Sequence, residues 1–550
     1  MIRRPSSFLT IVIAVFVIFY LYYFANQFNT PSSLLPSSVT DASLQKKPPP
    51  LGAQPDTNPK DRYITVTATV SSVTTKTTFS DSGVDSNVQS VAPLPADYFP
   101  SDDDLDQDAT WCETRYGPTY LQTIAKNARP FCKPESQSQF DCLHSNMYGE
   151  SRKDSLCIAQ NVVFEDLRFN IDCELRNSRE PDLMGYPHPN NFQSYWYETG
   201  PRIIMTQFTN IGSEAAPLFE KHACSNPATP RDDGYKILIK REGGRNYWHS
   251  LMEILSFYFT IDALQMSINK KTGKPYMSPA DTSKIQVIVL DKHDNKNYFE
   301  LWNYFSPKPV LTLDEYVKDP STKPCISNVI IPLPGASNPL WQGDWDPRIC
   351  DNSIIVSTIR RRILKHLKIS TARDLHSPIN LTFIDRKGSR KLTNSKELTD
   401  ALIAAYPKVN VKVVDMADLT LKEQISLVVN TDVLVGVHGA GHTHAFFLPP
   451  QSSLVEILPA DLKHKGFRNL AGLRGIRYFS DHAPMAPSDR PDTSRDWHAE
   501  DVVFDKDAFM KLMEAAIQSV AHRGFLDSDR LNSCFGSSYG QVNRTQDVLL

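Results

Sequence analysis

Short apolar runs separated by polar stretches of helical length dominate the last third of the chain. These runs occur at residues 380–385, 409–414, 433–437 and 453–458. Each is rich in Val, Ile and Leu and long enough for one buried strand of a parallel sheet. A helix is expected at residues 396–406, and residues 421–430 lead into the third run. This alternation predicts an α/β lobe built on parallel strands.

A similar pattern appears earlier in the chain, after a cysteine-rich, irregular stretch at residues 112–224. A glycine-containing turn separates the first predicted strand of this part from a long apolar helix. The predicted elements are strands at residues 235–239, 285–290 and 329–332 and a helix at 247–264. We therefore expect two α/β lobes, an N-terminal one at residues 109–376 and a C-terminal one at residues 377–480.

An uninterrupted apolar run at residues 8–24 stands apart from both lobes. Arg3 and Arg4 precede it, so we expect a transmembrane signal-anchor at residues 8–25, with residues 1–7 in the cytosol. A cleavable signal peptide is the competing interpretation. Bulky aromatic residues at the end of the run occupy the region where a cleavage site needs small ones, which favours the uncleaved anchor.

Two further segments flank the lobes. Residues 26–108 are rich in Ser, Thr, Pro and Asp, and such a composition cannot bury enough apolar surface to offset the entropy of ordering. We expect a disordered stem there. The C-terminal tail, residues 481–550, contains one predicted helix at residues 506–522, which we expect to pack back on the first lobe.

Charge and cysteine content indicate the compartment. The 550-residue chain has a net charge of −3, so no nucleic-acid partner is expected. All nine cysteines follow the anchor; disulfide bonds are expected, at least one cysteine has no partner within the chain, and the pairing cannot be read from spacing. Asn380 and Asn543 begin glycosylation sequons. These features predict a single-pass type II protein of the Golgi or ER membrane with both lobes in the lumen.

A glycine-containing loop follows the strand at residues 433–437. It consists of His438, Gly439, Ala440 and Gly441, and a helix is expected to start at Thr443. The unpaired amides at such a helix start favour phosphate. Glu456, near the end of the next strand, is a candidate for hydrogen bonds to ribose.

Two alternatives apply to this loop. Many strand–glycine–helix units bind no nucleotide. The close spacing of His438, His442 and His444 also suggests a metal site, but glycines interrupt the helical spacing and no Cys or acidic residue lies beside them. We expect no metal.

Polar groups follow two other strands. Arg386, Arg390 and Lys391, after the strand at 380–385, are candidates to clamp a diphosphate, although arginines on a surface loop are often only solvated. Asn246, His249 and Glu253 share one face of the helix at 247–264. The alternative for this trio is an N-cap and a solvated polar face. An Asp-x-Asp pair at Asp344 and Asp346 lies in a loop and carries little weight.

The ordered motifs resemble one family. They are Asn246-x-x-His249-x-x-x-Glu253, Arg386-x-x-x-Arg390-x-Leu392-x-Asn394, Asn430-Thr431-Asp432, His438-Gly439-Ala440-Gly441-x-Thr443-His444, and Phe467-x-x-Leu470-Ala471-x-x-x-Gly475-x-x-Tyr478. The set is similar to glycosyltransferase family 61, which includes plant β-1,2-xylosyltransferases and EGF-domain O-linked N-acetylglucosaminyltransferases of the secretory pathway. The resemblance covers roughly residues 236–478. Two positions depart from the family pattern: His442 stands where an apolar residue is usual, and Glu253 where Asp is usual.

The resemblance implies a GT-B-like fold, two Rossmann-like lobes with a cleft between them. It also implies a UDP-sugar donor in the C-terminal lobe, inversion at the anomeric carbon, and no obligatory metal cofactor. The implied donor-binding residues are Arg386, Arg390, Asn394, His438, Gly439, Ala440, Gly441, Thr443, His444 and Glu456. The implied catalytic residues are Glu253 or His249 as general base, oriented by Asn246.

The sequence therefore predicts transfer of xylose or N-acetylglucosamine from a UDP-sugar to a hydroxyl of a glycan or glycoprotein. An inactive sugar- or nucleotide-binding scaffold of the same fold is the alternative, and a metal-dependent luminal hydrolase is a second. The motifs do not identify the sugar, the acceptor or the general base.

Overall fold

The computed structural model describes residues 91–98, 110–145, 153–195, 198–243, 246–295, 297–304, 306–372, 377–484 and 500–522. The chain divides into two compact units, Met1–Ser82 and Gly83–Leu550, and every described residue belongs to the second. The predicted anchor, most of the stem, Asn543 and Cys534 lie outside the described residues. Among the described residues, no helix has the length and apolar character needed to cross a membrane.

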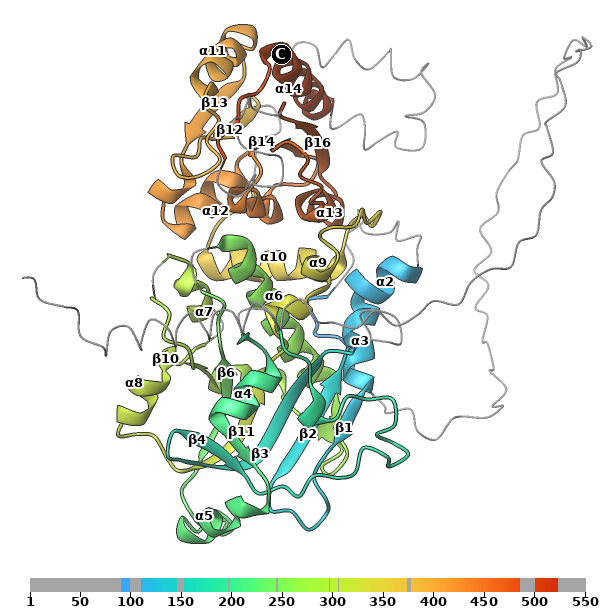
Figure 1. Cartoon of the computed structure of the whole chain (residues 1–550), viewed down its shortest axis with the longest axis vertical. Helices are drawn as coiled ribbons and strands as arrows, with labels where there is room; N and C mark the ends of the chain where they lie inside the picture. The colour runs from blue at the N-terminus through green and yellow to red at the C-terminus, as the bar shows by residue number, and fades with distance from the viewer. Residues whose placement is uncertain are drawn as a thin grey trace, which may run out of the picture. The chain divides into compact units, whose positions relative to one another are not determined.

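The first lobe is built on a nine-stranded mixed sheet (Figure 1). Its strands are β1 (Ala128–Pro130), β2 (Gln139–His144), β3 (Ser155–Glu165), β4 (Arg168–Ile171), β5 (Thr209–Ile211), β6 (Asp232–Ile239), β9 (Ile285–Val289), β10 (Leu311–Thr312) and β11 (Cys325–Ile331). Their order is β1-β2-β3-β11-β6-β9-β10, with β4 pairing with β3 and β5. The β11-β6-β9-β10 part is parallel, whereas β1, β2, β3 and β11 are antiparallel. The predicted strands of this lobe therefore lie in its parallel part.

Helix α6 (Tyr247–Met266) is the central helix of this lobe, and 18 of its 20 residues are buried. It is apolar on all sides, which is typical of a helix enclosed by other elements. Asn246 caps it by accepting a hydrogen bond from the Trp248 N–H at 3.0 Å. A short hairpin of β7 (Ile268–Asn269) and β8 (Lys274–Pro275) follows it.

The other helices of the lobe are short, except α10. They are α2 (Thr110–Tyr116), α3 (Pro118–Lys126), α4 (Pro201–Phe208), α5 (Ala216–Lys221), α7 (Glu300–Asn303), α8 (Leu313–Lys318), α9 (Pro339–Gln342) and α10 (Ile354–Leu367). The largest core contains residues of both lobes, including those of α6, α10 and η9 (Ala440–Phe447). Arg360 of α10 donates to the Phe447 carbonyl at 3.0 Å. The lobes are therefore joined by a shared apolar core.

The second lobe has a five-stranded, entirely parallel sheet. Its strands are β12 (Asn380–Ile384), β13 (Asn410–Val414), β14 (Val433–Val437), β15 (Ser453–Leu458) and β16 (Arg477–His482), and its helices are α11 (Ser395–Ala405), α12 (Leu421–Val429), α13 (Gly466–Leu473) and α14 (Lys506–Ala521). The strand order is β13-β12-β14-β15-β16. Connections leave β12 toward one edge and β14 toward the other, so the topological switch point lies between these two strands. The predicted α/β lobe with parallel strands is confirmed.

The expected packing of the tail helix on the first lobe is wrong. Helix α14 contacts β15, β16 and α11 of the second lobe, and Figure 1 shows it beside β16. Its apolar residues, including Phe509, Met513 and Ile517, belong to the core on one face of the second sheet. The helix packs there because its apolar stripe, together with Leu398 and Leu402 of α11, covers this face of the second sheet.

Residues 91–98 contact the first lobe, although their composition suggested part of the stem. Val91 forms a β-bridge with Ser267. The Tyr98 hydroxyl donates to Asp262 at 2.5 Å, and Arg362 of α10 also pairs with this carboxylate at 2.8 Å. In the described part of the chain, the ordered lobe thus includes residues preceding position 109.

Eight of the nine cysteines form four disulfide bonds, which confirms the expectation of disulfides. The pairs are Cys112–Cys350, Cys132–Cys173, Cys142–Cys157 and Cys224–Cys325. All four lie in the first lobe. Asn380, the predicted glycosylation site in the described region, is the first residue of β12 and accepts a hydrogen bond from Asn410 at 2.9 Å.

Candidate functional site

Two predicted donor-binding elements meet at the topological switch point. Arg386 follows the carboxyl end of β12, and His438 and Gly439 follow the carboxyl end of β14. The Arg386 Nη1 donates to the His438 carbonyl at 3.1 Å. A Cβ at Gly439 would lie 1.7 Å from Arg386 Nη1 and 3.4 Å from Arg390 Nη2. Glycine at this position therefore leaves room for both guanidinium groups.

This edge of the sheet is suited to an anion. Burial lowers the pKa of Arg386, and within the described residues Arg386 makes no salt bridge. The helix after the loop begins at Ala440 rather than Thr443 and is a 3-10 helix. The first N–H groups of such a helix have no acceptor inside it and favour negative charge. A partly buried guanidinium and a helix start therefore lie at the same strand ends.

Glu456 has a different role from the one that its strand position suggested. It is 1% exposed; its Oε1 pairs with His438 Nδ1 at 2.5 Å, and its Oε2 accepts from the Tyr478 hydroxyl at 2.5 Å. Burial acts to raise the pKa of Glu456, but the hydrogen bonds from His438 and Tyr478 bring it below the usual value. Burial lowers the pKa of His438 to about 4. A neutral His438 that donates from Nδ1 to this carboxylate carries its lone pair on Nε2.

Two predicted donor residues, Thr443 and His444, lie in the protein interior, and a third, Asn394, is half-buried. Thr443 and His444 are 0% and 1% exposed. The His444 ring packs on Tyr247 at 4.6 Å, and its Nε2 contacts Gln424 Oε1 at 2.7 Å. The Asn394 side chain donates to the Phe504 carbonyl at 2.9 Å. These side chains support the loop and the fold from behind and do not line its surface.

The first lobe contributes a cluster of two carboxyl groups and one imidazole at the start of α6. Glu253 accepts from the Glu242 N–H at 2.8 Å, and Glu242 Oε2 lies 2.8 Å from His249 Nδ1. Asn246 is exposed and acts as the N-cap. The predicted sharing of one face thus holds for His249 and Glu253. The structure adds Glu242, which lies in the turn between β6 and α6 and contacts both.

The protonation of this cluster follows from burial. Burial raises the pKa of Glu242 to about 8 and raises that of Glu253 above its usual value, with the neighbouring Glu242 acting in the same direction. Two close carboxyl groups out of water cannot both ionise at neutral pH without a large cost. Burial also lowers the pKa of His249 to about 4. At neutral pH, His249 is therefore neutral and the carboxyl pair retains a proton.

Aromatic and polar contacts bring these two halves together. Trp248 of α6 packs on Phe467 at 5.3 Å, and Phe467 packs on His438 at 5.3 Å. Asp344 of the first lobe pairs with His464 of the second at 3.2 Å. The His464 ring lies 5.0 Å from that of His438. The Asp344–His464 pair is a part of the site that the sequence reasoning did not identify.

The Asp-x-Asp pair is divided between two roles. Asp344 faces His464, whereas Asp346 pairs with Arg348 at 2.9 Å. Across the described ranges, no group of three His, Cys, Asp or Glu side chains is arranged to hold a metal ion. His442 contacts the Val455 carbonyl at 3.2 Å and is fully buried, so it belongs to the core.

Comparison with known proteins gives one family. The Glycosyltransferase 61 family model matches residues 247–455. The EGF domain-specific O-linked N-acetylglucosamine transferase of Drosophila melanogaster is 23% identical over 419 residues, 70% of this chain and 69% of the relative. Its counterpart from Rattus norvegicus is 24% identical over 440 residues, with 75% and 76% covered. The Xenopus laevis protein is 30% identical over 173 residues, with 30% and 33% covered.

The matched region extends from the first residue of α6 into β15 and so includes His249, Glu253, Arg386 and Gly439. These findings support a glycosyltransferase. The resemblance to glycosyltransferase family 61 is thereby confirmed over residues 247–455.

Proposed function

We propose that this protein is an inverting, GT-B-like glycosyltransferase that transfers a sugar from a UDP-sugar to a hydroxyl of a glycoprotein or glycan. One observation carries the proposal: Arg386 and Gly439 meet at the β12–β14 switch point of a parallel sheet. Nucleotides bind α/β sheets at such points. The names of the relatives favour N-acetylglucosamine over xylose and an EGF domain as the acceptor.

On the donor side, the second lobe binds the UDP moiety. The diphosphate lies against Arg386, Arg390 and the N–H groups at the start of η9. These groups stabilise the negative charge that develops on UDP as the anomeric bond breaks. Glu456 holds His438 at the strand ends, and His438 Nε2 then contacts a donor hydroxyl or phosphate oxygen. No metal ion takes part in this proposal, because cationic side chains supply the charge.

On the acceptor side, the first lobe accepts the proton of the attacking hydroxyl. The hydroxyl oxygen forms a bond to the anomeric carbon, UDP departs with the bonding electrons, and the hydroxyl proton passes to the base. His249 is a stronger candidate for the base than Glu253, because the His249 side chain is 19% exposed whereas Glu253 is buried. Glu242 orients the His249 ring through its contact with Nδ1.

The proposed location is the lumen of the Golgi or ER. Four disulfide bonds support an oxidising compartment. The apolar run at residues 8–24 supports a single N-terminal anchor. If this is correct, full-length protein sediments with membranes and resists alkaline extraction. Recovery of a soluble form that starts near residue 26 would contradict the anchor.

The stereochemistry of the product tests the proposed mechanism. UDP-N-acetylglucosamine carries an α linkage, so in-line attack yields a β-linked product. Proton NMR of the glycosylated acceptor measures the anomeric coupling directly. A retained α linkage would overturn the inverting mechanism. Binding of UDP without any transfer would favour an inactive scaffold.

A further inference from the structure

Residues 339–350 of the first lobe lie beside the proposed base. Trp341 of α9 packs on the His249 ring, with the two ring centres 4.3 Å apart. Four residues later, the Trp345 ring lies 5.2 Å from the ring of His464 in the second lobe. This short segment therefore runs from the base to the donor side of the site. An acceptor that brings its hydroxyl group to His249 lies close to this segment.

Asn469 of α13 holds the segment against the second lobe. Its side chain donates to the Gly343 carbonyl at 3.0 Å and to the Asp346 carbonyl at 2.9 Å. It also accepts from the Arg348 N–H at 2.9 Å. Helix α9 contacts α13, as Figure 1 shows. Side chains that this segment exposes are therefore held in fixed positions beside the reacting groups.

The segment exposes two large apolar side chains, Trp345 at 54% and Ile349 at 86%. Trp111, 41% exposed, lies near Ile349, because each of these two residues precedes a cysteine of the Cys112–Cys350 disulfide bond. Nine large apolar side chains are exposed among the described residues, and three of them gather here. Single exposed apolar residues are ordinary, but a cluster beside a reaction site indicates an interaction surface. We call these three residues the exposed apolar surface.

The chemistry of the exposed apolar surface favours a polypeptide over a free glycan. The Arg115 and Arg348 guanidinium groups lie over the Trp111 ring, 5.1 and 5.2 Å from its centre, so that ring is not open for a pyranose to stack on. The Ile349 side chain offers no hydrogen bond to a sugar hydroxyl, and Arg348 is already paired with Asp346 at 2.9 Å. Trp and Arg are enriched at the centres of protein–protein interfaces.

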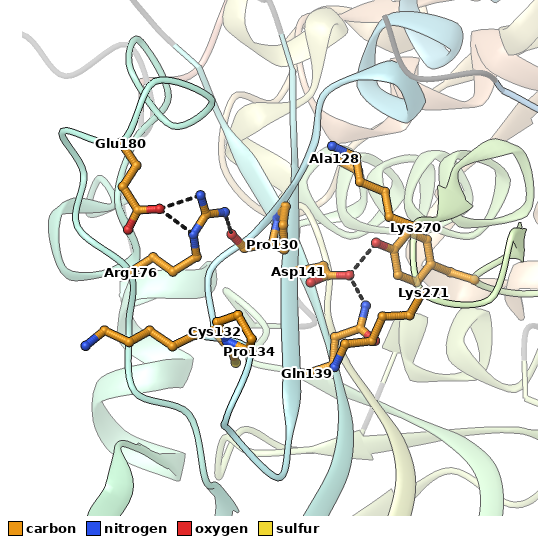
Figure 2. A pocket seen from close by; sticks show the side chains of 12 residues that line it. Ala128, Pro130, Cys132, Pro134, Gln139, Asp141, Arg176, Glu180, Lys270 and Lys271 are labelled. Carbon is orange, nitrogen blue, oxygen red and sulfur yellow. Dashed lines mark hydrogen bonds and ion pairs between the residues drawn. The ribbon is translucent and has the colours of Figure 1, made fainter. Parts of the chain in front are cut away.

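A cavity of about 550 Å³ elsewhere in the first lobe, shown in Figure 2, does not suit this acceptor. It lies beside the hairpin that follows the carboxyl end of α6, whereas His249 lies in the first turn of that helix. Because α6 has 20 residues, its ends are about 30 Å apart. The buried carboxyl group in its wall, Asp141, is 2% exposed and already bonded to Tyr276 and Gln139. A hydroxyl group held in this cavity is out of reach of the base.

We propose that the exposed apolar surface binds a polypeptide acceptor, with an apolar side chain of that acceptor packed on Trp345 and Ile349 while its Ser or Thr hydroxyl lies at His249. This inference rests on the proposed function, because it assigns the acceptor of that reaction. Trp345 and Ile349 set the affinity for the acceptor and contribute nothing to UDP binding. The enzyme thus selects its acceptor by side chains around the reacting hydroxyl.

Binding of an EGF domain to the full chain, measured by surface plasmon resonance with saturating UDP, tests this proposal. Ile349→Asp places a charge in the surface, and Trp345→Ala removes its largest side chain. Each is expected to weaken binding of the EGF domain roughly tenfold or more, as for a central interface residue, with UDP affinity unchanged. In transfer assays, both variants are expected to raise KM for the EGF domain by the same factor and to retain kcat at saturating acceptor.

Met184→Ala is the matched control, because Met184 is 62% exposed and lies outside the exposed apolar surface. Ile349→Asp keeps the test decisive if Trp345→Ala displaces His464, since Ile349 lies outside the core. The proposal is overturned if the parent does not bind the EGF domain, if folded Ile349→Asp binds it as the parent does, or if Met184→Ala loses as much. Transfer by the parent to a free N-glycan core but not to the EGF domain also overturns it.

The binding measurement separates this proposal from the proposed function. A parent protein that binds the EGF domain through Ile349 but releases no UDP from any UDP-sugar contradicts the proposed function and supports the exposed apolar surface as the polypeptide site. A parent that glycosylates the EGF domain with the same KM as Ile349→Asp supports the proposed function and overturns this inference.

Discussion

Gly439→Ala perturbs the proposed diphosphate site with a single methyl group. The added Cβ would lie 1.7 Å from Arg386 Nη1, so the guanidinium must move. It is the far end of a flexible side chain, and the buried strands β12 and β14 do not have to shift. Alanine also rarely adopts the φ of 157° found at Gly439, so the loop backbone is strained as well. We expect the second sheet to remain intact while Arg386 leaves its place beside the His438 carbonyl.

The expected loss is that of one charge-assisted contact to phosphate. Such a contact contributes about 1.5–3 kcal/mol, which corresponds to roughly 10- to 150-fold weaker UDP binding. Isothermal titration with UDP measures this directly. Arg386→Ala removes the same contact and is expected to give a loss of the same size.

Gly388→Ala is the matched control. Gly388 lies in the same basic loop as Arg386, and an added Cβ there meets no atom within 4 Å. It is expected to bind UDP as the parent protein does. The reasoning is refuted if Gly439→Ala retains parental UDP affinity in a folded protein. Equal losses in Gly439→Ala and Gly388→Ala would also refute it, since the effect would then not come from Arg386.

Three further predictions concern catalysis and stability. His249→Ala is expected to lower turnover by about 10²–10⁴ with UDP affinity unchanged, and Glu253→Gln to lower it less; a larger loss in Glu253→Gln would make Glu253 the base. Cys224→Ala with Cys325→Ala opens a link between residues separated by 101 positions, so urea unfolding should show a loss of about 2–5 kcal/mol; an unchanged midpoint would contradict this. Burial lowers the pKa of His144 to about 3. As the pH falls from about 6.5 toward 3, His144 therefore takes up a proton in the unfolded chain but not in the folded chain, and the folded state loses stability. His144→Phe should reduce the drop in unfolding free energy between neutral and acidic pH, and an identical drop would argue against a neutral His144.

Local sequence predicted the elements of the fold well, because each is a compact apolar run or stripe. The strands at 433–437 and 453–458 are observed at those positions, and helix α6 begins at the expected residue. The destination of α14 was not predictable in the same way. Its apolar periodicity defines a face that must be buried, but which sheet that face covers depends on the whole topology.

The candidate site, like the fold, could be predicted from local sequence only in part. Arg386 and Gly439 were proposed from their positions after strand ends, and they lie together because parallel strands bring such positions to one edge. Glu242 was missed, although an acidic residue directly before a glycine turn and a polar-faced helix is a usable signal. The Asp344–His464 pair joins residues 120 positions apart, and no local pattern predicts such a contact. The position of Glu456 in its strand was correct, but its partners His438 and Tyr478 follow from the order of neighbouring strands.

The most direct test of the account is UDP release by the purified full-length protein, measured across a panel of UDP-sugars with and without an EGF-domain acceptor. The account predicts acceptor-dependent release from UDP-N-acetylglucosamine or UDP-xylose, with the release strongly reduced in Arg386→Ala and unaffected by chelation of divalent metals. Absence of release from every UDP-sugar in a protein that still binds UDP would contradict the assignment as an active transferase.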